Sequence, residues 1–524
     1  MKREGEPVMN LSRRKFVGAG AAALTGTALG LGFPSGTSAR PNVLMIITDE
    51  QSLWTLSQFG GALPGTPHID SIGKRGATFR NFFVTSAVCT PSRGCYMTGR
   101  FPHTHGAYHN DLPLNPDEFT LGHLFSNAGY ETGYAGKWHL DGRNDPSWPD
   151  WIPDARSFGF KDHQWMFNQG HWKRIMERPK DWPQNKSEAV TSASFDANAV
   201  AKSVGGPPTY TSPQPDGHPD LSYAVGASGE FFTEWLTDKA IEFIERPRQS
   251  PFFYVLSYPD PHPPFSVSEP YASMFPPASM KVPETFHQKD LPKWAEQMRQ
   301  DDYKRENVTS GDDPRRETTL RTRKAEYLGM IKCVDDNVGR ILQTLRERNM
   351  LDNTMILFTS DHGEYMGEHG MYFKNALYEP AHHVGMVMCW PGHIAPGTNV
   401  EQCVANVDLL PTLAAMLGLK TAGKEQGRDA SALLRGESKQ WDDLAYIHKD
   451  NFSQSGVFTQ QWELGLAKDG DHVLFNRKKD PLQVNNLYHS PACAGVVKDL
   501  TARTIAHNQR VGCPATEWLV KLAV

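Results

Sequence analysis

The sequence predicts an α/β fold, in which a large, mainly parallel sheet is flanked by helices and followed by a smaller C-terminal α+β unit. Short apolar, β-branched runs at 42–48 and 354–359 are typical of strands buried on both faces of a parallel sheet. Helical patterns alternate with such runs over hundreds of residues, as in parallel α/β sheets. At 524 residues the chain is long enough for one large domain and a smaller companion.

The remaining elements of the large domain follow from the same patterns. Further strands are expected at 252–258 and 384–389, with a weaker signal at 130–136. Apolar residues at helical spacing predict amphipathic helices at 231–244 and 318–349. Because sites in such sheets form beyond the carboxyl ends of the strands, the acidic residues that follow the strands are candidate site residues.

We expect three parts along the chain, namely 1–39, 40–420 and 421–524. The first is expected to be a signal segment, the second a catalytic domain and the third a smaller subdomain. A helix should begin within 407–413, and 458–476 should supply an antiparallel hairpin in the last part.

The first part resembles a twin-arginine export signal. Ser12-Arg13-Arg14-Lys15-Phe16 precedes an uncharged, weakly apolar stretch, and small residues at 37–39 offer a cleavage point. A transmembrane anchor is the alternative interpretation, although many of the residues in that stretch are Gly or Thr. We therefore expect a periplasmic or secreted protein without stable membrane insertion.

Composition excludes several other classes of protein. A formal net charge of −5 gives no basic surface for nucleic acid, although a locally positive pocket for a small anion remains possible. The seven cysteines are odd in number and irregular in spacing, so the sequence predicts neither a disulfide framework nor a zinc site. The oligomeric state is not indicated.

Two segments, 141–222 and 266–316, are expected to be insertions or long surface loops. The first is rich in Trp, Pro, Asp and Ser, and the second in Pro and charged residues. Loops of that length often cover a site. The aromatic residues that could stack on sugar or aryl rings, or simply pack, are Trp148, Trp151, Trp165 and Trp172.

The most informative motif runs from Cys89 to Arg100. Ser92 is a good N-cap, so we expect Cys89 on a loop just ahead of a short helix. Helix N-termini favour anions, and Arg93 adds a positive charge. Taken alone, the pattern indicates an electropositive site beside a nucleophilic side chain, while a lone cysteine there is more often a buried structural thiol.

The whole motif, Cys-x-Pro-Ser-Arg followed by Met-Thr-Gly-Arg, is similar to the signature of the type I, formylglycine-dependent sulfatases of the alkaline phosphatase-like superfamily. Other segments that resemble this family are 41–49, 66–70, 129–134, 136–139, 261–265, 360–364 and, more loosely, 480–488. The resemblance implies that Cys89 is oxidised to formylglycine by a formylglycine-generating enzyme. It implies hydrolysis of a small-molecule or glycan sulfate ester.

The resemblance also implies a divalent cation. Its ligands would be Asp49, Glu50, Asp361, His362 and the modified Cys89. The common family pattern has Asp-Asp where this sequence has Asp49-Glu50, and Asp-Asn where it has Asp361-His362. Oxygen ligands favour Ca²⁺, whereas the imidazole makes Mn²⁺ acceptable, and Mg²⁺ is a further possibility.

Five cations and imidazoles match positions that surround sulfate and the leaving oxygen in the family. They are Arg93, Lys137, His139, His262 and Lys374. Charge developing in the transition state must be stabilised, and the leaving alcohol must be protonated. Asp361 is the expected base. His105 and Asn110 have weaker support as pocket residues, and His382-His383 has no assigned role.

Two alternative functions remain open from the sequence. A phosphonate monoester or phosphodiester hydrolase of the same superfamily is suggested by Asp361-His362. A non-catalytic sulfoglycan-binding protein is the other alternative, and the intact motif around Cys89 argues against it. No HExxH, HxxEH, GxSxG or P-loop motif is present, so zinc-protease, serine-hydrolase and P-loop chemistries are not indicated.

Overall fold

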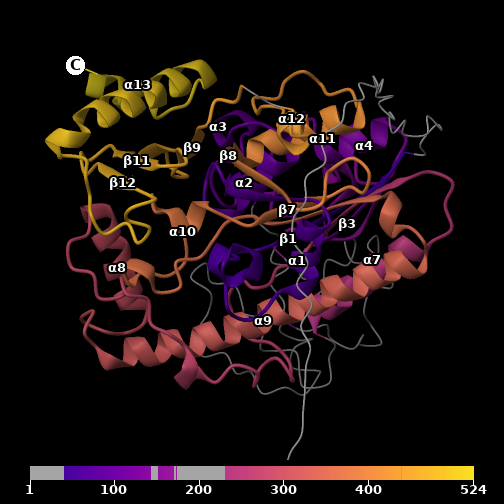
Figure 1. Cartoon of the computed structure of the whole chain (residues 1–524), viewed down its shortest axis with the longest axis horizontal. Helices are drawn as coiled ribbons and strands as arrows, with labels where there is room; N and C mark the ends of the chain where they lie inside the picture. The colour runs from indigo at the N-terminus through magenta and orange to yellow at the C-terminus, as the bar shows by residue number, and fades with distance from the viewer. Residues whose placement is uncertain (1–39, 143–151, 170–172, 174–230, 438–439, 524) are drawn as a thin grey trace, which may run out of the picture. The chain divides into compact units, whose positions relative to one another are not determined.

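A large mixed sheet forms the centre of the protein in a computed structural model, which describes residues 40–142, 152–169, 173, 231–437 and 440–523. Its eight strands lie in the order β4-β3-β5-β1-β6-β7-β2-β8, and β1, β3, β7 and β8 are labelled in Figure 1. They are β1 (Asn42–Thr48), β2 (Ala77–Phe83), β3 (Glu131–Lys137), β4 (Asp162–Phe167), β5 (Phe252–Ser257), β6 (Thr354–Ser360), β7 (Met386–Cys389) and β8 (Thr398–Ala405). All neighbours are parallel except those of β7, which runs antiparallel to β6 and β2.

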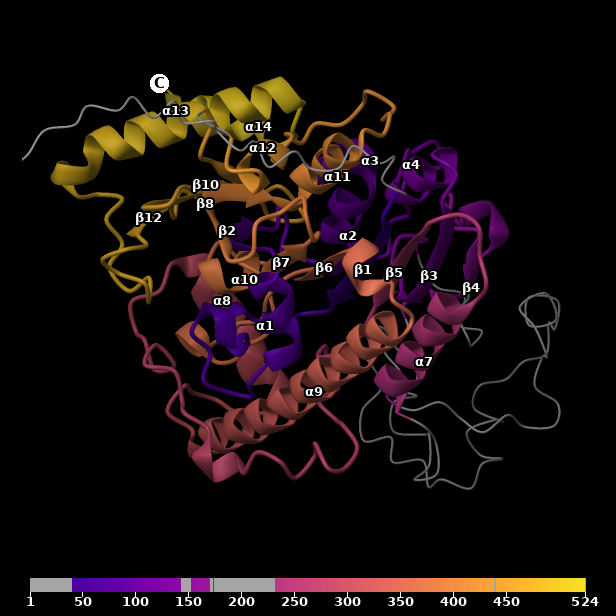
Figure 2. The ribbon, with the colours of Figure 1, turned by 45° about the vertical axis from the view of Figure 1, so that its right-hand side comes forward.

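Helices cover both faces of this sheet (Figure 2). The main helices are α1 (Pro67–Lys74), α2 (Cys89–Thr98), α4 (Leu121–Asn127), α7 (Phe232–Glu245), α9 (Pro314–Glu347) and α11 (Leu409–Leu417). Side chains from α1, α7 and α9 share one apolar cluster with Leu44 and Ile46 of β1. Val43, Met45 and Ile47 face the other cluster, together with α2, α4 and α11. Burial on both faces explains why β1 is apolar throughout.

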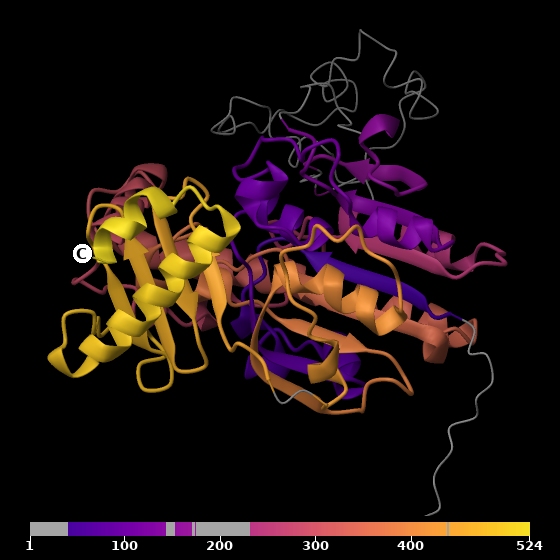
Figure 3. The ribbon, with the colours of Figure 1, turned by 90° about the horizontal axis from the view of Figure 1, so that it is seen from above.

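A second, four-stranded antiparallel sheet follows near the C-terminus. It consists of β9 (Ala445–His448), β10 (Gln454–Phe458), β11 (Trp462–Ala467) and β12 (Val473–Asn476), in the order β12-β11-β10-β9. Helix α13 (Ala494–Val511) packs across β10 and β11, followed by α14 (Thr516–Leu519) (Figure 3). Residues 41–524 form one compact unit, so a domain boundary near residue 420 stays a prediction.

Shorter helices complete the large unit, namely α3 (Pro102–His105), α8 (Lys293–Arg305), α10 (Glu379–His382) and α12 (Ser431–Leu434). Helix α8 lies within 266–316, so this predicted insertion is partly helical. Most of the other predicted insertion, 141–222, and the expected signal segment, 1–39, lie outside the described residues. Within the described residues, no helix is both long and apolar enough to cross a membrane.

The fold class and the predicted elements of the core are confirmed. Strands β1, β3, β5, β6 and β7, helices α7, α9 and α11, and the β11–β12 hairpin all lie where the sequence predicted them. Strands β2, β4 and β8 were not predicted. In β2, Arg80 and Asn81 interrupt the apolar run. Arg80 donates to Asn399 of β8 and to the carbonyl of Gln58, and Asn81 donates to the carbonyl of Glu401 in β8.

Two histidines are buried where α13 meets the small sheet. His448 of β9 is fully buried, and its Nδ1 lies 3.2 Å from Ser455 Oγ. The His507 ring of α13 stacks on Tyr446, with ring centroids 3.7 Å apart. Burial lowers the pKa of His448 to about 3 and that of His507 to about 2. Both imidazoles are therefore neutral in the folded protein at neutral pH.

We predict that stability falls as the pH drops below about 6.5, the ordinary histidine pKa, because the unfolded chain then binds protons that the folded chain excludes. Each buried histidine contributes up to about 1.4 kcal/mol per pH unit. The substitution His507→Phe, which keeps a ring on Tyr446, should make urea denaturation less pH-dependent between pH 6 and 5. Exposed His489→Phe is the control, and an unchanged slope in the His507 variant would contradict this explanation.

Candidate active site

The candidate site lies at the carboxyl ends of the central parallel strands. Asp49 follows β1, Asp361 follows β6, and Lys137 is the last residue of β3. Two backbone hydrogen bonds extend the sheet there. The Asp361 N–H donates to Thr48 O at 3.0 Å, and the Asp49 N–H donates to Asp260 O at 3.2 Å. The strand ends therefore converge as the parallel topology predicts.

Helix α2 brings Cys89 to these strand ends. The helix begins at Cys89 itself, after Val88, so the prediction that Ser92 caps the helix and leaves Cys89 on a preceding loop is wrong. Ser92 Oγ instead donates to the carbonyl of Asp361. The Ser92 hydroxyl thus ties the helix to the end of β6, and Cys89 sits at the helix N-terminus, where partial positive charge favours an anionic group.

Four buried groups converge on one point. Cys89 Sγ lies 3.6 Å from Asp49 Oδ1 and 3.2 Å from His362 Nε2. His362 Nε2 lies 3.8 Å from Asp49 Oδ1 and 3.6 Å from Asp361 Oδ1. All four side chains are inaccessible to solvent or nearly so. We call Asp49, Cys89, Asp361 and His362 the four-group cluster.

The four-group cluster fits a divalent cation. Two carboxylate oxygens, an imidazole nitrogen and one atom from residue 89 form a mixed, mostly anionic donor set. His362 Nδ1 lies 2.9 Å from Gly363 O, and donation of that N–H leaves the Nε2 lone pair directed at the cluster. Burial lowers the pKa of His362, but its anionic neighbours, Asp361 first, raise it to about 9. A cation therefore competes with a proton for Nε2.

Arg93 connects the carboxylates of the cluster. Its Nε donates to Asp361 Oδ2 at 2.8 Å, and its Nη2 lies 3.7 Å from Asp49 Oδ2. The Nη1 donates at 2.8 Å to both Lys137 O and Ser257 Oγ. Nη2 is buried and makes no hydrogen bond to the described residues. A second anion could use this donor.

Lys137 and His139 stand beside Asp49. The Lys137 ammonium donates to Asp49 Oδ2 and is inaccessible to solvent. His139 adopts a left-handed backbone conformation, with φ of 58°, and its carbonyl accepts a 2.9 Å hydrogen bond from Thr90 Oγ1. Burial, reinforced by Lys137, lowers the pKa of His139 well below its ordinary value. His139 is therefore a neutral hydrogen-bonding group rather than a fixed charge.

Glu50, His262 and Lys374 form a second group at the edge of the site. Glu50 Oε2 lies 2.5 Å from Lys374 Nζ and 3.2 Å from His262 Nε2. Among the described residues, Glu50 Oε1 is buried and makes no geometric hydrogen bond. Its carboxylate is outside the four-group cluster, so the predicted role of Glu50 as a metal ligand stays a prediction. His262 and Lys374 are partly exposed.

The charge of the site favours an anion at position 89. Burial, and then the neighbouring Asp49 carboxylate, raise the pKa of the Cys89 thiol. The surrounding cations, Lys137 and Lys374 foremost, outweigh burial and lower that pKa to about 5. By contrast, burial raises the pKa of Cys95 well above its ordinary value, and Cys95 packs in the core. The two cysteines of one motif thus have opposite chemical environments.

The weaker candidates have supporting or structural positions. Asn110 Oδ1 accepts a 3.1 Å hydrogen bond from the N–H of Thr90 in the first turn of α2. His105 is buried, its Nε2 lies 3.7 Å from Cys95 Sγ, and it is not a member of the four-group cluster. His382 and His383 bond to nearby carbonyls and to Glu379.

Sequence reasoning did not find Thr90, Ser257 or Asn406, although each holds a site residue. Asn406 Nδ2 donates to Ser92 O at 3.1 Å, which fixes the first turn of α2. Ser257 could have been found, because it ends a predicted strand.

Of the tryptophans suggested to stack on substrate, Trp165 packs against Trp235. The other three, Trp148, Trp151 and Trp172, lie outside the described residues.

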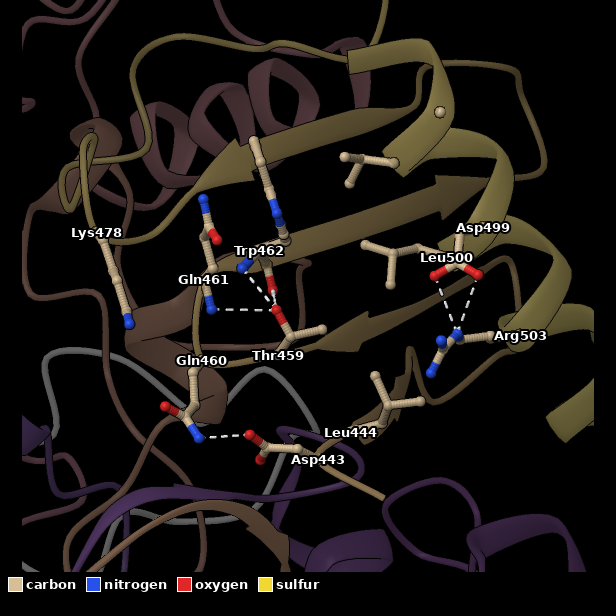
Figure 4. Close-up of a pocket in the computed structure, with 12 residues that line it drawn as sticks. Asp443, Leu444, Thr459, Gln460, Gln461, Trp462, Lys478, Asp499, Leu500 and Arg503 are labelled. Carbon is tan, nitrogen blue, oxygen red and sulfur yellow. Dashed lines mark hydrogen bonds and ion pairs between the residues drawn. The ribbon is translucent and has the colours of Figure 1, made fainter. Parts of the chain in front are cut away.

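A separate groove of about 590 Å³ lies on the small C-terminal sheet (Figure 4). The turn before β11 and the start of α13 form its walls. Gln460 bonds to Asp443, and Arg503 pairs with Asp499. None of the predicted catalytic or metal-binding residues lines this groove. It is therefore distinct from the candidate active site.

Comparison with known proteins identifies two family matches. The sulfatase family model matches residues 41–419, and the model of the N-sulphoglucosamine sulphohydrolase C-terminal region matches residues 367–510. The N-acetylglucosamine-6-O-sulfatase of Bacteroides thetaiotaomicron is 26% identical over 88% of this chain and 85% of its own.

Solved structures share the fold. A protein in complex with its substrate D-glucosamine-2-N,6-O-disulfate has a TM-score of 0.70 and 23% identity, covering 91% of this chain and 99% of its own. The phosphonate monoester hydrolase of Agrobacterium radiobacter has a TM-score of 0.67 and 24% identity, and the match covers 90% of this chain and 96% of the hydrolase chain.

We predict that Arg93→Lys lowers the kcat of ester hydrolysis by about 100-fold or more, because one ammonium cannot replace donors directed at several acceptors. Arg100→Lys is the matched control, since Arg100 lies in the same motif but bonds to Glu118. Steady-state kinetics on folded protein checks the prediction. Equal kcat values for the two variants would contradict it.

Proposed function

The chain belongs to the sulfatase family, and we propose that it hydrolyses sulfate esters with a formylglycine formed from Cys89 beside one divalent cation. The observation that carries this proposal is the position of Cys89. It lies at the N-terminus of α2, buried with two carboxylates and an imidazole. The cations Lys137 and Lys374 are close enough to lower its pKa. A thiol with an ordinary structural role would need none of these neighbours.

Asp49, Asp361 and His362 would hold the cation together with residue 89. When bound, a divalent cation lowers the pKa of an oxygen ligand and stabilises negative charge on the reacting oxygens. We favour Ca²⁺ because carboxylate oxygens dominate the donor set, and the single imidazole also suits Mn²⁺, with Mg²⁺ a third possibility. Glu50 remains a candidate ligand, because its carboxylate lies close to ligand atoms of Asp49 and His262.

The modified residue would supply both the nucleophile and the means of releasing sulfate. A hydrated formylglycine has two hydroxyl groups, of which one attacks sulfur and the other, by losing its proton, expels sulfate and restores the aldehyde. A serine or cysteine has no second hydroxyl group on the same carbon, so it could not expel the sulfate in this way. Asp361, beside residue 89 and bonded to Arg93, would accept a proton from the hydrate.

The remaining side chains of the site bind the sulfate and protonate the leaving group. Arg93 Nη2 and Lys137 would bind sulfate oxygens, and neutral His139 would add a hydrogen bond. The leaving alcohol would take its proton from His262 or Lys374, which form the partly exposed edge of the site. Sulfate binding and proton donation are thus assigned to different residues.

We further propose that the substrate is a carbohydrate sulfate ester. Support comes from the relative that acts on N-acetylglucosamine-6-O-sulfate, by its name, and from the structure that holds a disulfated glucosamine. Aryl sulfates should serve as assay substrates. The proposed location is the periplasm or the exterior, reached through the twin-arginine motif at 12–16, and maturation would require a formylglycine-generating enzyme.

We expect purified protein matured in its own host to release sulfate from 4-nitrophenyl sulfate and from a glucosamine 6-sulfate. Cys89→Ala should fold normally and lose this turnover, whereas Cys95→Ala, a change at the other cysteine of the motif, should retain it. Sulfate release and thermal unfolding are the measurements.

A much faster hydrolysis of phosphonate monoesters or phosphodiesters than of any sulfate ester would favour the alternative function, which the His362 in the cluster makes worth testing. Full activity of Cys89→Ala would reject the proposed nucleophile.

A further inference from the structure

A buried lysine outside the predicted site contacts the loop that carries His262. Lys173 is 2% exposed, and its ammonium donates to the Asp260 carboxylate. The same ammonium donates to the carbonyl of His262 at 2.9 Å and lies 3.5 Å from Met330 Sδ on α9. Neither the motif nor the proposed mechanism gives Lys173 a role.

Asp260 connects this lysine to the end of β1. Its carbonyl accepts the Asp49 N–H, and its carboxylate Oδ2 accepts a 2.5 Å hydrogen bond from Thr233 Oγ1. Asp260 is 1% exposed and Thr233 is fully buried. A buried carboxylate requires a counter-charge and hydrogen-bond donors. Lys173 supplies the charge, and Thr233 supplies the second donor.

The main-chain carbonyl of Lys173 is also bonded. Its carbonyl accepts a 2.9 Å hydrogen bond from the N–H of Phe232, the first residue of α7. Lys173 is therefore held at its main chain by α7 and at its ammonium by the 260–262 segment. The segment that this ion pair contacts also accepts the Asp49 N–H, at the Asp260 carbonyl, and carries the His262 imidazole, which faces Glu50.

We propose that Lys173 is a positioning residue, which with Asp260 holds His262 where it donates a proton to the leaving group. The proposal rests on the proposed function, because it assigns a partner to the acid of that reaction. Loss of the Lys173 ammonium would free the His262 carbonyl and leave Asp260 with Thr233 alone. The imidazole would then be displaced from the leaving oxygen.

The test compares leaving groups of different basicity. Expulsion of 4-nitrophenolate needs little protonation, whereas expulsion of an alkoxide needs a general acid. We expect Lys173→Met to lower kcat/KM for an alkyl or sugar sulfate at least about 10-fold more than for 4-nitrophenyl sulfate. Lys332→Met is the matched control, because Lys332 pairs with Asp336 on α9 instead. An equal loss on both substrates would overturn the proposal.

Hydrogen–deuterium exchange of the 258–265 backbone gives a readout that needs no turnover. Exchange there should rise in Lys173→Met and stay unchanged in Lys332→Met, and unchanged exchange in both would also overturn the proposal. If Lys173→Met fails to fold, the double variant Lys173→Met, Asp260→Asn replaces it in both experiments. This variant removes the charges of both partners and so leaves neither buried and unpaired. Wild-type protein that hydrolyses no sulfate ester contradicts the proposed function, and the exchange experiment then decides the role of Lys173 alone.

Discussion

The buried ion-pair network of Arg93 with Asp49 and Asp361 is the interaction on which the rest of the site depends. Two carboxylates at adjacent strand ends repel each other and lose their hydration, so they need a fixed cation between them. Arg93 meets both and also holds the carbonyl of Lys137. Its guanidinium can do this because it is planar, permanently charged and rich in donors.

The fold supplies what this network requires. Parallel pairing of β1 with β5 and β6 brings three strand ends together, and burial on both faces leaves them no freedom to shift register. Helix α2 then projects Cys89 and Arg93 from adjacent turns toward those ends, held by Ser92 and Asn406. Residue 89 thus lies next to both anionic metal-ligand candidates and cations, as a metal-assisted nucleophile requires.

Much of this arrangement could be predicted from the sequence, because the informative residues are adjacent to buried strands. Asp49 and Asp361 directly follow β-branched runs that only burial on both faces explains. Strand β2 was not predicted, because the polar residues Arg80 and Asn81 interrupt its apolar run. In the folded protein these two side chains bond to β8, which is distant in sequence. The Ser92 prediction failed because a hydroxyl that could cap a helix bonds instead to a residue distant in sequence.

Lys173 shows the same limit of sequence reasoning. It lies in a segment rich in tryptophan and proline, and its partner Asp260 is 87 residues away. No local spacing predicts such a pair. The pairing of Glu50 with Lys374, far along the chain, is likewise not indicated by local spacing, and the predicted role of Glu50 as a metal ligand stays a prediction.

The chemical state of residue 89 is the central claim of this account, and mass spectrometry of the peptide that contains it, from protein produced in its own host, tests that claim most directly. We predict the mass of an aldehyde or its hydrate in place of the Cys89 thiol, with Cys95 unchanged. An unmodified thiol at Cys89 in a preparation that hydrolyses sulfate esters would contradict the proposed nucleophile.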